Sequence, residues 1–156
     1  MTLKLSIFQC KPSWKSINTN SMATLFTKII RGDIPSYFVA ENDEHFAFLD
    51  INPLAKGHTL VIPKKETDYI FDLNESETSK LHLFAKKVAR AVESVVPCKR
   101  IGMAVVGLEV PHAHIHLIPI NNVSDINFAN PKISLTSEEF EEIAANIRKA
   151  FEKNLK

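Results

Sequence analysis

The apolar positions of the chain follow two periodicities, and the shorter one predicts strands. Residues 37–41 and 45–50 are rich in aromatic and β-branched side chains and are separated by an Asn-Asp pair, which favours a hairpin. A short apolar run at 59–62 is closed by Pro63 and predicts a buried strand. Two further strands are predicted over residues 100–106 and 113–120.

The longer periodicity predicts helices. Between residues 75 and 96 apolar side chains recur at intervals of three and four, as on one face of an α-helix, and Pro97 ends the pattern. A short helix is predicted over residues 25–30, and Thr136 with Glu139 forms a capping box ahead of a C-terminal amphipathic helix. Together these elements predict an α+β fold: an antiparallel five-stranded sheet with a short N-terminal helix, one long central helix and a C-terminal helix.

One domain is expected, because 156 residues suffice for one buried core and are too few for two ordinary domains. Residues 1–21 carry lysines but no acidic side chain and show little apolar periodicity. We therefore expect a loosely ordered extension over residues 1–21 and a folded domain over residues 22–156. The extension is interpreted either as a targeting leader or as a stretch upstream of a start at Met22.

Composition narrows the class of protein. Hydrophobic residues make up 45% of the chain and charged residues 24%, which is ordinary for a soluble globular domain. The formal net charge of +1 gives no reason to expect nucleic acid or an anionic membrane as a partner, so any phosphate must be bound by local contacts. The two cysteines, Cys10 and Cys98, form no CxxC pair, and no apolar run is long enough to span a membrane. A cytoplasmic location is expected.

Three histidines at every second position carry the candidate chemistry. His112, His114 and His116 lie at the start of the last predicted strand. Because side chains in a strand alternate between faces, the three imidazoles should project together, with the apolar residues between them on the opposite face. On a helix, residues two apart diverge by about 200°, so the spacing favours a strand.

Three interpretations of this row are open. It could be a structural row of polar residues, although neighbouring imidazoles repel when protonated and each buried one needs a partner. It could bind a metal, although three such residues on one strand span about 13 Å and would need help from another strand. It could also hold a nucleophilic imidazole between two others that bind or protonate an anionic centre, which suits phosphoryl or nucleotidyl transfer.

The segment His-Ala-His-Ile-His-Leu-Ile resembles the signature of the histidine-triad (HIT) superfamily, in which alternate histidines precede two apolar residues. Three further blocks follow the order of that family: an opening helix and turn at 25–35, and nucleoside-binding strands at 46–53 and 57–65. The resemblance extends over roughly residues 24–120. It implies a nucleotide-binding hydrolase that cleaves purine nucleoside monophosphate conjugates of the phosphoramidate type through a nucleotidyl-histidine, with no cofactor and no metal.

The resemblance also implies a role for individual residues. His114 would attack the α-phosphorus, His112 and His116 would contact phosphate oxygens and help to move the proton, and His58 would be a fourth, orienting histidine. Asp50 would accept hydrogen bonds from the ribose hydroxyls. The purine would be enclosed by apolar side chains, namely Leu25, Phe26, Ile29, Phe48 and Ile51.

The chain departs from the family pattern at two places. Thr24 and Thr27 stand where some bacterial members carry a CxxC zinc pair, so no structural zinc is expected there. Leu108 stands where members usually have a glutamine, so we expect phosphoramidates to be better substrates than dinucleoside polyphosphates. Two alternatives are a dinucleoside polyphosphate hydrolase with the same histidines and a nucleotide-binding regulatory module with weak catalysis. The family resemblance further implies a homodimer, formed across the long helix and a sheet edge.

Overall fold

A computed structural model describes residues 23–154, so the expected extension at 1–21 lies outside the described residues. Five strands form one sheet in the order β1-β2-β3-β5-β4, and every neighbouring pair is antiparallel. The strands are β1 (Phe38–Glu41), β2 (His45–Leu49), β3 (Thr59–Pro63), β4 (Arg100–Ala104) and β5 (Ile115–Ile120). The helices are α1 (Leu25–Arg31), α2 (Glu75–Val95) and α3 (Ser137–Lys153), with short 3₁₀ turns η1 (Ile70–Asp72) and η2 (Val123–Ile126). The predicted α+β fold is confirmed.

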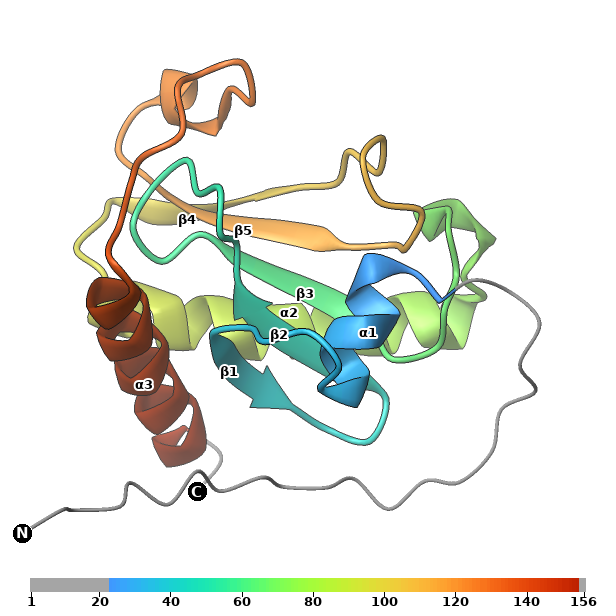
Figure 1. Ribbon diagram of the computed structural model, residues 1–156. Coiled ribbons are helices and arrows are strands. Elements are labelled where there is room, and N and C mark those ends of the chain that lie inside the picture. The colour runs from blue at the N-terminus through green and yellow to red at the C-terminus, as the bar shows by residue number, and fades with distance from the viewer. Residues whose placement is uncertain (1–22, 155–156) are drawn as a thin grey trace, which may run out of the picture.

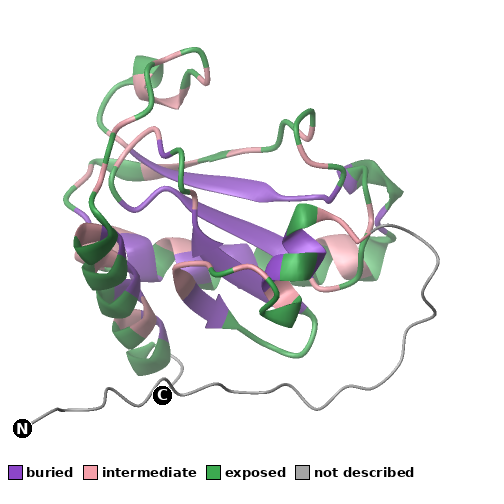
Figure 2. Cartoon of the chain, viewed as in Figure 1, coloured by how far each residue is buried: buried purple, intermediate pink, exposed green. Residues whose placement is uncertain are grey.

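The larger core lies between the sheet and helices α2 and α3 (Figure 1). Its fully buried side chains include Val61 and Ile115 from the sheet, Leu81 from α2 and Ile147 from α3. Figure 2 shows that the central strands β2, β3 and β5 are buried along nearly their whole length. No helix of residues 23–154 has both the length and the apolar character that crossing a membrane requires.

A smaller cluster lies on the opposite face of the sheet, under α1. Phe26 and Ile29 of α1 are buried against Phe48, Leu60 and Ile62 of the sheet. The helix begins at an N-cap threonine and ends at a glycine with a φ of 78°, a left-handed conformation that glycine adopts without steric cost. Helix α1 therefore covers the face on which the even-numbered residues of β5 project.

The histidine strand begins later than predicted. Strand β5 starts at Ile115, so His112 and His114 precede it and only His116 lies within it. Continuing the register of β3 and β5 places Pro63 opposite Ala113, and proline has no N–H to donate to the ladder. The backbone N–H of Ala113 instead donates to the carbonyl of Thr67 at 2.7 Å. Similarly, β4 ends at Ala104 rather than at residue 106.

Candidate active site

The three histidines gather on the α1 face of the sheet, as the alternation predicts. All three are buried, and the apolar residues between them join the larger core on the other face. The ring of His114 lies 4.8 Å from that of His116 and 5.2 Å from that of Phe26. The ring of His112 lies 5.8 Å from the ring of Phe26. Phe26 of α1 is thus a common apolar neighbour of His112 and His114.

His114 has a fixed proton position when it is neutral. Its Nδ1 lies 2.7 Å from the backbone carbonyl of His112. A carbonyl oxygen only accepts, so Nδ1 carries the proton and donates it to this bond. The other nitrogen, Nε2, then keeps its lone pair. An imidazole held in this tautomer can act as a nucleophile at neutral pH.

A second hydrogen-bonded chain fixes His116 through His58. The backbone N–H of Leu54 donates to Nδ1 of His58 at 3.1 Å, so Nε2 of His58 carries the proton. That Nε2 lies 3.0 Å from Nδ1 of His116, which accepts, so His116 carries its own proton on Nε2. Burial, with smaller effects of neighbouring charges, lowers the pKa of His58 to about 3 and that of His116 to about 4. Both rings are therefore neutral at pH 7.

His112 has no free ring nitrogen. Its Nε2 donates to the carbonyl of Pro63 at 2.8 Å, so its Nδ1 accepts from the hydroxyl of Thr24 at 2.9 Å. The contacts continue from Thr24 to the hydroxyl of Thr27 at 3.0 Å and from Thr27 to the carboxylate of Glu66. Both ring nitrogens of His112 therefore have hydrogen-bond partners within the protein, and its contact with phosphate stays a prediction. The backbone carbonyl of His112 also accepts from Nδ1 of His114.

Asp50 follows β2 and lies near the supporting histidine. One carboxylate oxygen accepts from the backbone N–H of Asn52 at 2.9 Å, and the other lies 3.7 Å from Nε2 of His58. Because His58 is neutral at pH 7, the second contact is not an ion pair there. Burial raises the pKa of Asp50, and the Asn52 hydrogen bond partly offsets this effect.

The residues expected to enclose the purine divide into two groups. Phe26, Ile29 and Phe48 are buried in the cluster under α1, where the rings of Phe26 and Phe48 lie 5.4 Å apart. Leu25 and Ile51 instead present exposed apolar side chains. The structure thus places Phe26 beside both Phe48 and His114, whereas Leu25 and Ile51 contribute nothing to the core.

Sequence patterns missed a segment that packs against the histidines. Residues 121–135 leave the end of β5 and run back towards α3 (Figure 1). The ring of Phe128 lies 4.8 Å from that of His116 and 6.5 Å from that of His58. Lys132 lies over the same phenyl ring, 5.8 Å from its centroid. An isolated aromatic residue in a polar loop was the available signal, but the pattern could not show where that loop folds.

A cluster of three side chains that could bind a metal shares only one member, His116, with the row of three histidines. Among residues 23–154, Asp50, His58 and His116 bring three ligand-type atoms within 4.8 Å of one another. In the hydrogen-bond pattern described here, Nδ1 of His58 already accepts from Leu54 and its Nε2 carries a proton. Neither nitrogen of His58 therefore offers a free lone pair, and a metal would have to replace these hydrogen bonds.

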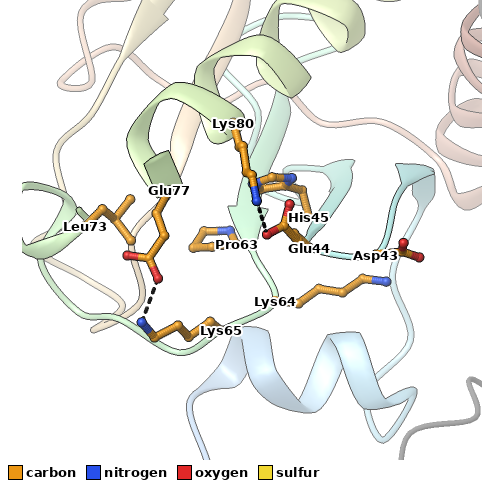
Figure 3. Close-up of a pocket in the computed structure, with 9 residues that line it drawn as sticks. All are labelled: Asp43, Glu44, His45, Pro63, Lys64, Lys65, Leu73, Glu77 and Lys80. Atoms are coloured by element: carbon orange, nitrogen blue, oxygen red, sulfur yellow. Dashed lines mark hydrogen bonds and ion pairs between the residues drawn. The ribbon is translucent and has the colours of Figure 1, made fainter. Parts of the chain in front are cut away.

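A separate cleft lies on the α2 side of the sheet and is distinct from the histidine site (Figure 3). His45 lies at this cleft, and its ring is stacked 5.3 Å from that of Phe84. Most of the charged side chains that line the cleft are paired. Lys80 contacts Glu44 at 2.8 Å, and Lys65 contacts Glu77 at 2.7 Å. The whole lining consists of Asp43, Glu44, His45, Pro63, Lys64, Lys65, Leu73, Glu77 and Lys80.

Comparison with known proteins identifies the family. The sequence profile of the HIT domain matches residues 31–123. The chain belongs to the HIT domain family. An adenosine 5'-monophosphoramidase of Schizosaccharomyces pombe is 34% identical over 134 residues, which cover 81% of this chain and 100% of the relative. An uncharacterised HIT-like protein of Borreliella burgdorferi is 34% identical over 131 residues, which cover 79% of this chain and 94% of the relative.

Solved HIT structures share the fold. A HIT-like protein from Bartonella henselae superposes with a TM-score of 0.73 at 33% identity and covers 85% of this chain and 99% of its own. A zinc-bound HIT family protein from Mycobacterium smegmatis gives a TM-score of 0.73 at 26% identity and covers 86% of this chain and 97% of its own. The sequence resemblance places Thr24 and Thr27 where some bacterial members carry a CxxC pair, and both residues have hydroxyl side chains. Because zinc prefers thiolate, imidazole and carboxylate ligands, these two hydroxyls do not replace that pair as zinc ligands.

Proposed function

We propose that this HIT domain protein hydrolyses purine nucleoside 5'-phosphoramidates through a covalent nucleotidyl intermediate on His114. The observation that carries the proposal is the 2.7 Å contact between Nδ1 of His114 and the carbonyl of His112, which leaves Nε2 as a lone-pair donor. Relatives named adenosine 5'-monophosphoramidase in Schizosaccharomyces pombe and Saccharomyces cerevisiae, 34% and 35% identical, support this substrate class.

The proposed reaction has two displacements. In the first, Nε2 of His114 bonds to the α-phosphorus, the bond from phosphorus to the leaving amine breaks, and the amine takes a proton from solvent. In the second, water attacks the same phosphorus and releases a proton, and the bond from phosphorus to Nε2 breaks with its electron pair returning to His114, which restores the neutral imidazole. Between the two displacements the imidazole of His114 carries a positive charge. This charge strengthens the hydrogen bond that its Nδ1–H donates to the carbonyl of His112. The Nε2–H of His116 is available to donate to a phosphoryl oxygen, where negative charge grows.

The loop before the triad favours a compact leaving group. Leu108 is 87% exposed and carries no group that could donate a hydrogen bond to an outer phosphate. A dinucleoside polyphosphate would depend on such a contact more than a small amine would. The alternative reaction, hydrolysis of dinucleoside polyphosphates by the same histidines, is therefore expected to be slower in kcat/KM.

The test is to trap the intermediate. Protein mixed with adenosine 5'-phosphoramidate and quenched in base should yield an adduct of nucleotide mass on the peptide that contains His114. The substitution His114→Ala should abolish the adduct and lower kcat/KM by about 10³-fold or more. His82→Ala, an exposed histidine of α2, is the matched control and should keep full turnover. An adduct on another residue, or undiminished turnover by His114→Ala, would exclude this mechanism.

A further inference from the structure

The charge balance around the histidines raises the question of what binds the phosphate. His58 and His116 are neutral at pH 7, and the nearby acidic groups Asp50 and Glu109 repel an anion. Burial is the largest cause of the pKa shifts of Asp50, His58 and His116. Of the lysines and arginines in residues 23–154, Lys132 alone has a charge that acts on all three groups. The charge of Lys132 would therefore attract a negatively charged phosphoryl group bound there.

Backbone contacts hold the segment around Lys132 in place. The backbone N–H of Ile133 donates to the carbonyl of Pro53 at 3.0 Å, which ties the segment to the loop between Asp50 and His58. Within the segment, the backbone N–H of Asn130 donates to the carbonyl of Asn127 at 3.0 Å. The segment is therefore attached to the active site by a hydrogen bond between two loops, outside any helix or strand.

Phe128 connects Lys132 to the histidines. The ammonium group of Lys132 donates to the carbonyl of Phe128 at 2.7 Å and lies over its ring, while the same ring contacts His116 at 4.8 Å. The lysine side chain is exposed and has a flexible four-carbon stem, so it can exchange its carbonyl partner for a phosphate oxygen. The ring of Phe128, in contrast, is half-buried and fixed against the site.

We propose that Phe128 and Lys132 form an anion subsite of the active site, in which the ammonium group of Lys132 binds the α-phosphoryl group of a nucleotide. Phe128 holds the lysine beside His116 and limits the access of water to that side. The inference rests on the proposed function for the identity of the ligand, a purine nucleoside monophosphate. It adds a specificity element to the triad: discrimination between a nucleotide and its nucleoside.

Binding of AMP and of adenosine to the whole chain tests the subsite, because the two ligands differ only in the phosphate. Isothermal titration calorimetry should show that Lys132→Met weakens AMP binding about tenfold, because one charge-assisted contact is lost. The same substitution should leave adenosine binding unchanged. Lys132→Arg should keep most of the AMP affinity. Lys149→Met, which removes an exposed lysine of α3, is the matched control and should bind both ligands like the wild type.

The outcomes separate the subsite from the reaction. An unchanged ratio of AMP to adenosine affinity in Lys132→Met, or an equal loss for both ligands, would overturn the subsite. Phe128→Leu gives a second check, because without its ring the lysine should lose its position and AMP affinity should fall while adenosine affinity is kept. If the wild type binds AMP but does not cleave phosphoramidates, the proposed reaction fails and the subsite stands. If it binds neither ligand, both proposals fall.

Discussion

The proton positions of the active-site imidazoles are set by groups that can only donate or only accept. The backbone N–H of Leu54 fixes His58, and the backbone carbonyl of His112 fixes His114. The carbonyl of Pro63 fixes the proton of His112 on Nε2. The remaining nitrogen, Nδ1, then accepts a hydrogen bond from the hydroxyl of Thr24. A single threonine therefore has two tasks, since it also caps α1 by accepting from the backbone N–H of Thr27 at 3.1 Å.

Replacing Thr24 should reveal both tasks as a loss of stability. In Thr24→Val the helix loses its cap, and the buried Nδ1 of His112 loses its donor, at a combined cost of about 2–4 kcal/mol in the free energy of unfolding. Thr24→Ser keeps the hydroxyl and should lose much less. Urea denaturation of the two variants measures the difference. Equal stability of the valine and serine variants would mean that neither contact contributes.

At the scale of elements, strand β4 is an unprotected edge. Within residues 23–154 it pairs only with β5, so its other side is an edge of the sheet. Met103 of this strand is 46% exposed, and the two residues that follow its end, Val105 and Val106, are 41% and 45% exposed. An exposed edge strand with apolar side chains is a surface that proteins usually cover. We propose that β4 of a second copy covers it, which would make the protein a homodimer.

Light scattering after size exclusion should then give twice the 17.6 kDa of one chain. Met103→Lys places a charge at the edge and should shift the protein towards the monomer, because two like charges would face each other across the two-fold axis. Phe71→Lys alters an exposed aromatic residue of η1 and should leave the mass unchanged. A monomeric wild type at micromolar concentration would refute the proposed dimer.

Across the whole molecule, the fold buries several histidines in their neutral form. Burial is the main cause that lowers the pKa of His45, His58, His112 and His116 below the ordinary value of 6.5. The unfolded chain therefore binds more protons than the native protein between pH 6.5 and the native pKa values, which are about 3 for His58 and about 4 for His116. The stability contributed by these histidines is complete above pH 6.5 and is lost as the pH falls through this window.

The free energy of unfolding should accordingly decrease from pH 7.5 to pH 5, by up to about 1.4 kcal/mol per pH unit for each buried histidine below pH 6.5. Asp50, with its pKa raised by burial, opposes this trend at the acidic end by at most one proton. Urea unfolding at several pH values measures the slope. The slope of the free energy of unfolding against pH should become shallower in His45→Gln. The control His82→Gln, at an exposed position, should match the wild type. A flat profile would contradict neutral burial.

Local sequence periodicity is enough to predict which faces of the elements are buried and where the histidines gather. The period of two that groups His114 and His116 also sends Ile115 and Leu117 into the core, and the period of α2 places Leu81 there. These are local properties, because neighbouring residues on one element share a face whatever the rest of the chain does. The four ordered blocks likewise predicted the HIT family, which the comparisons confirm.

Contacts in the tertiary structure, between segments that are distant in sequence, supply several of the hydrogen-bond partners of the histidines and the residues that face them. The start of β5 depends on Pro63, which offers no N–H, and the tautomer of His112 depends on the carbonyl of the same proline, 49 residues earlier in the chain. The approach of Phe128 and Lys132 to the triad depends on how a polar loop folds back over the site. Hydrogen-bond partners and neighbouring charges come from segments that are distant in sequence, and local periodicity carries no information about which of them will meet.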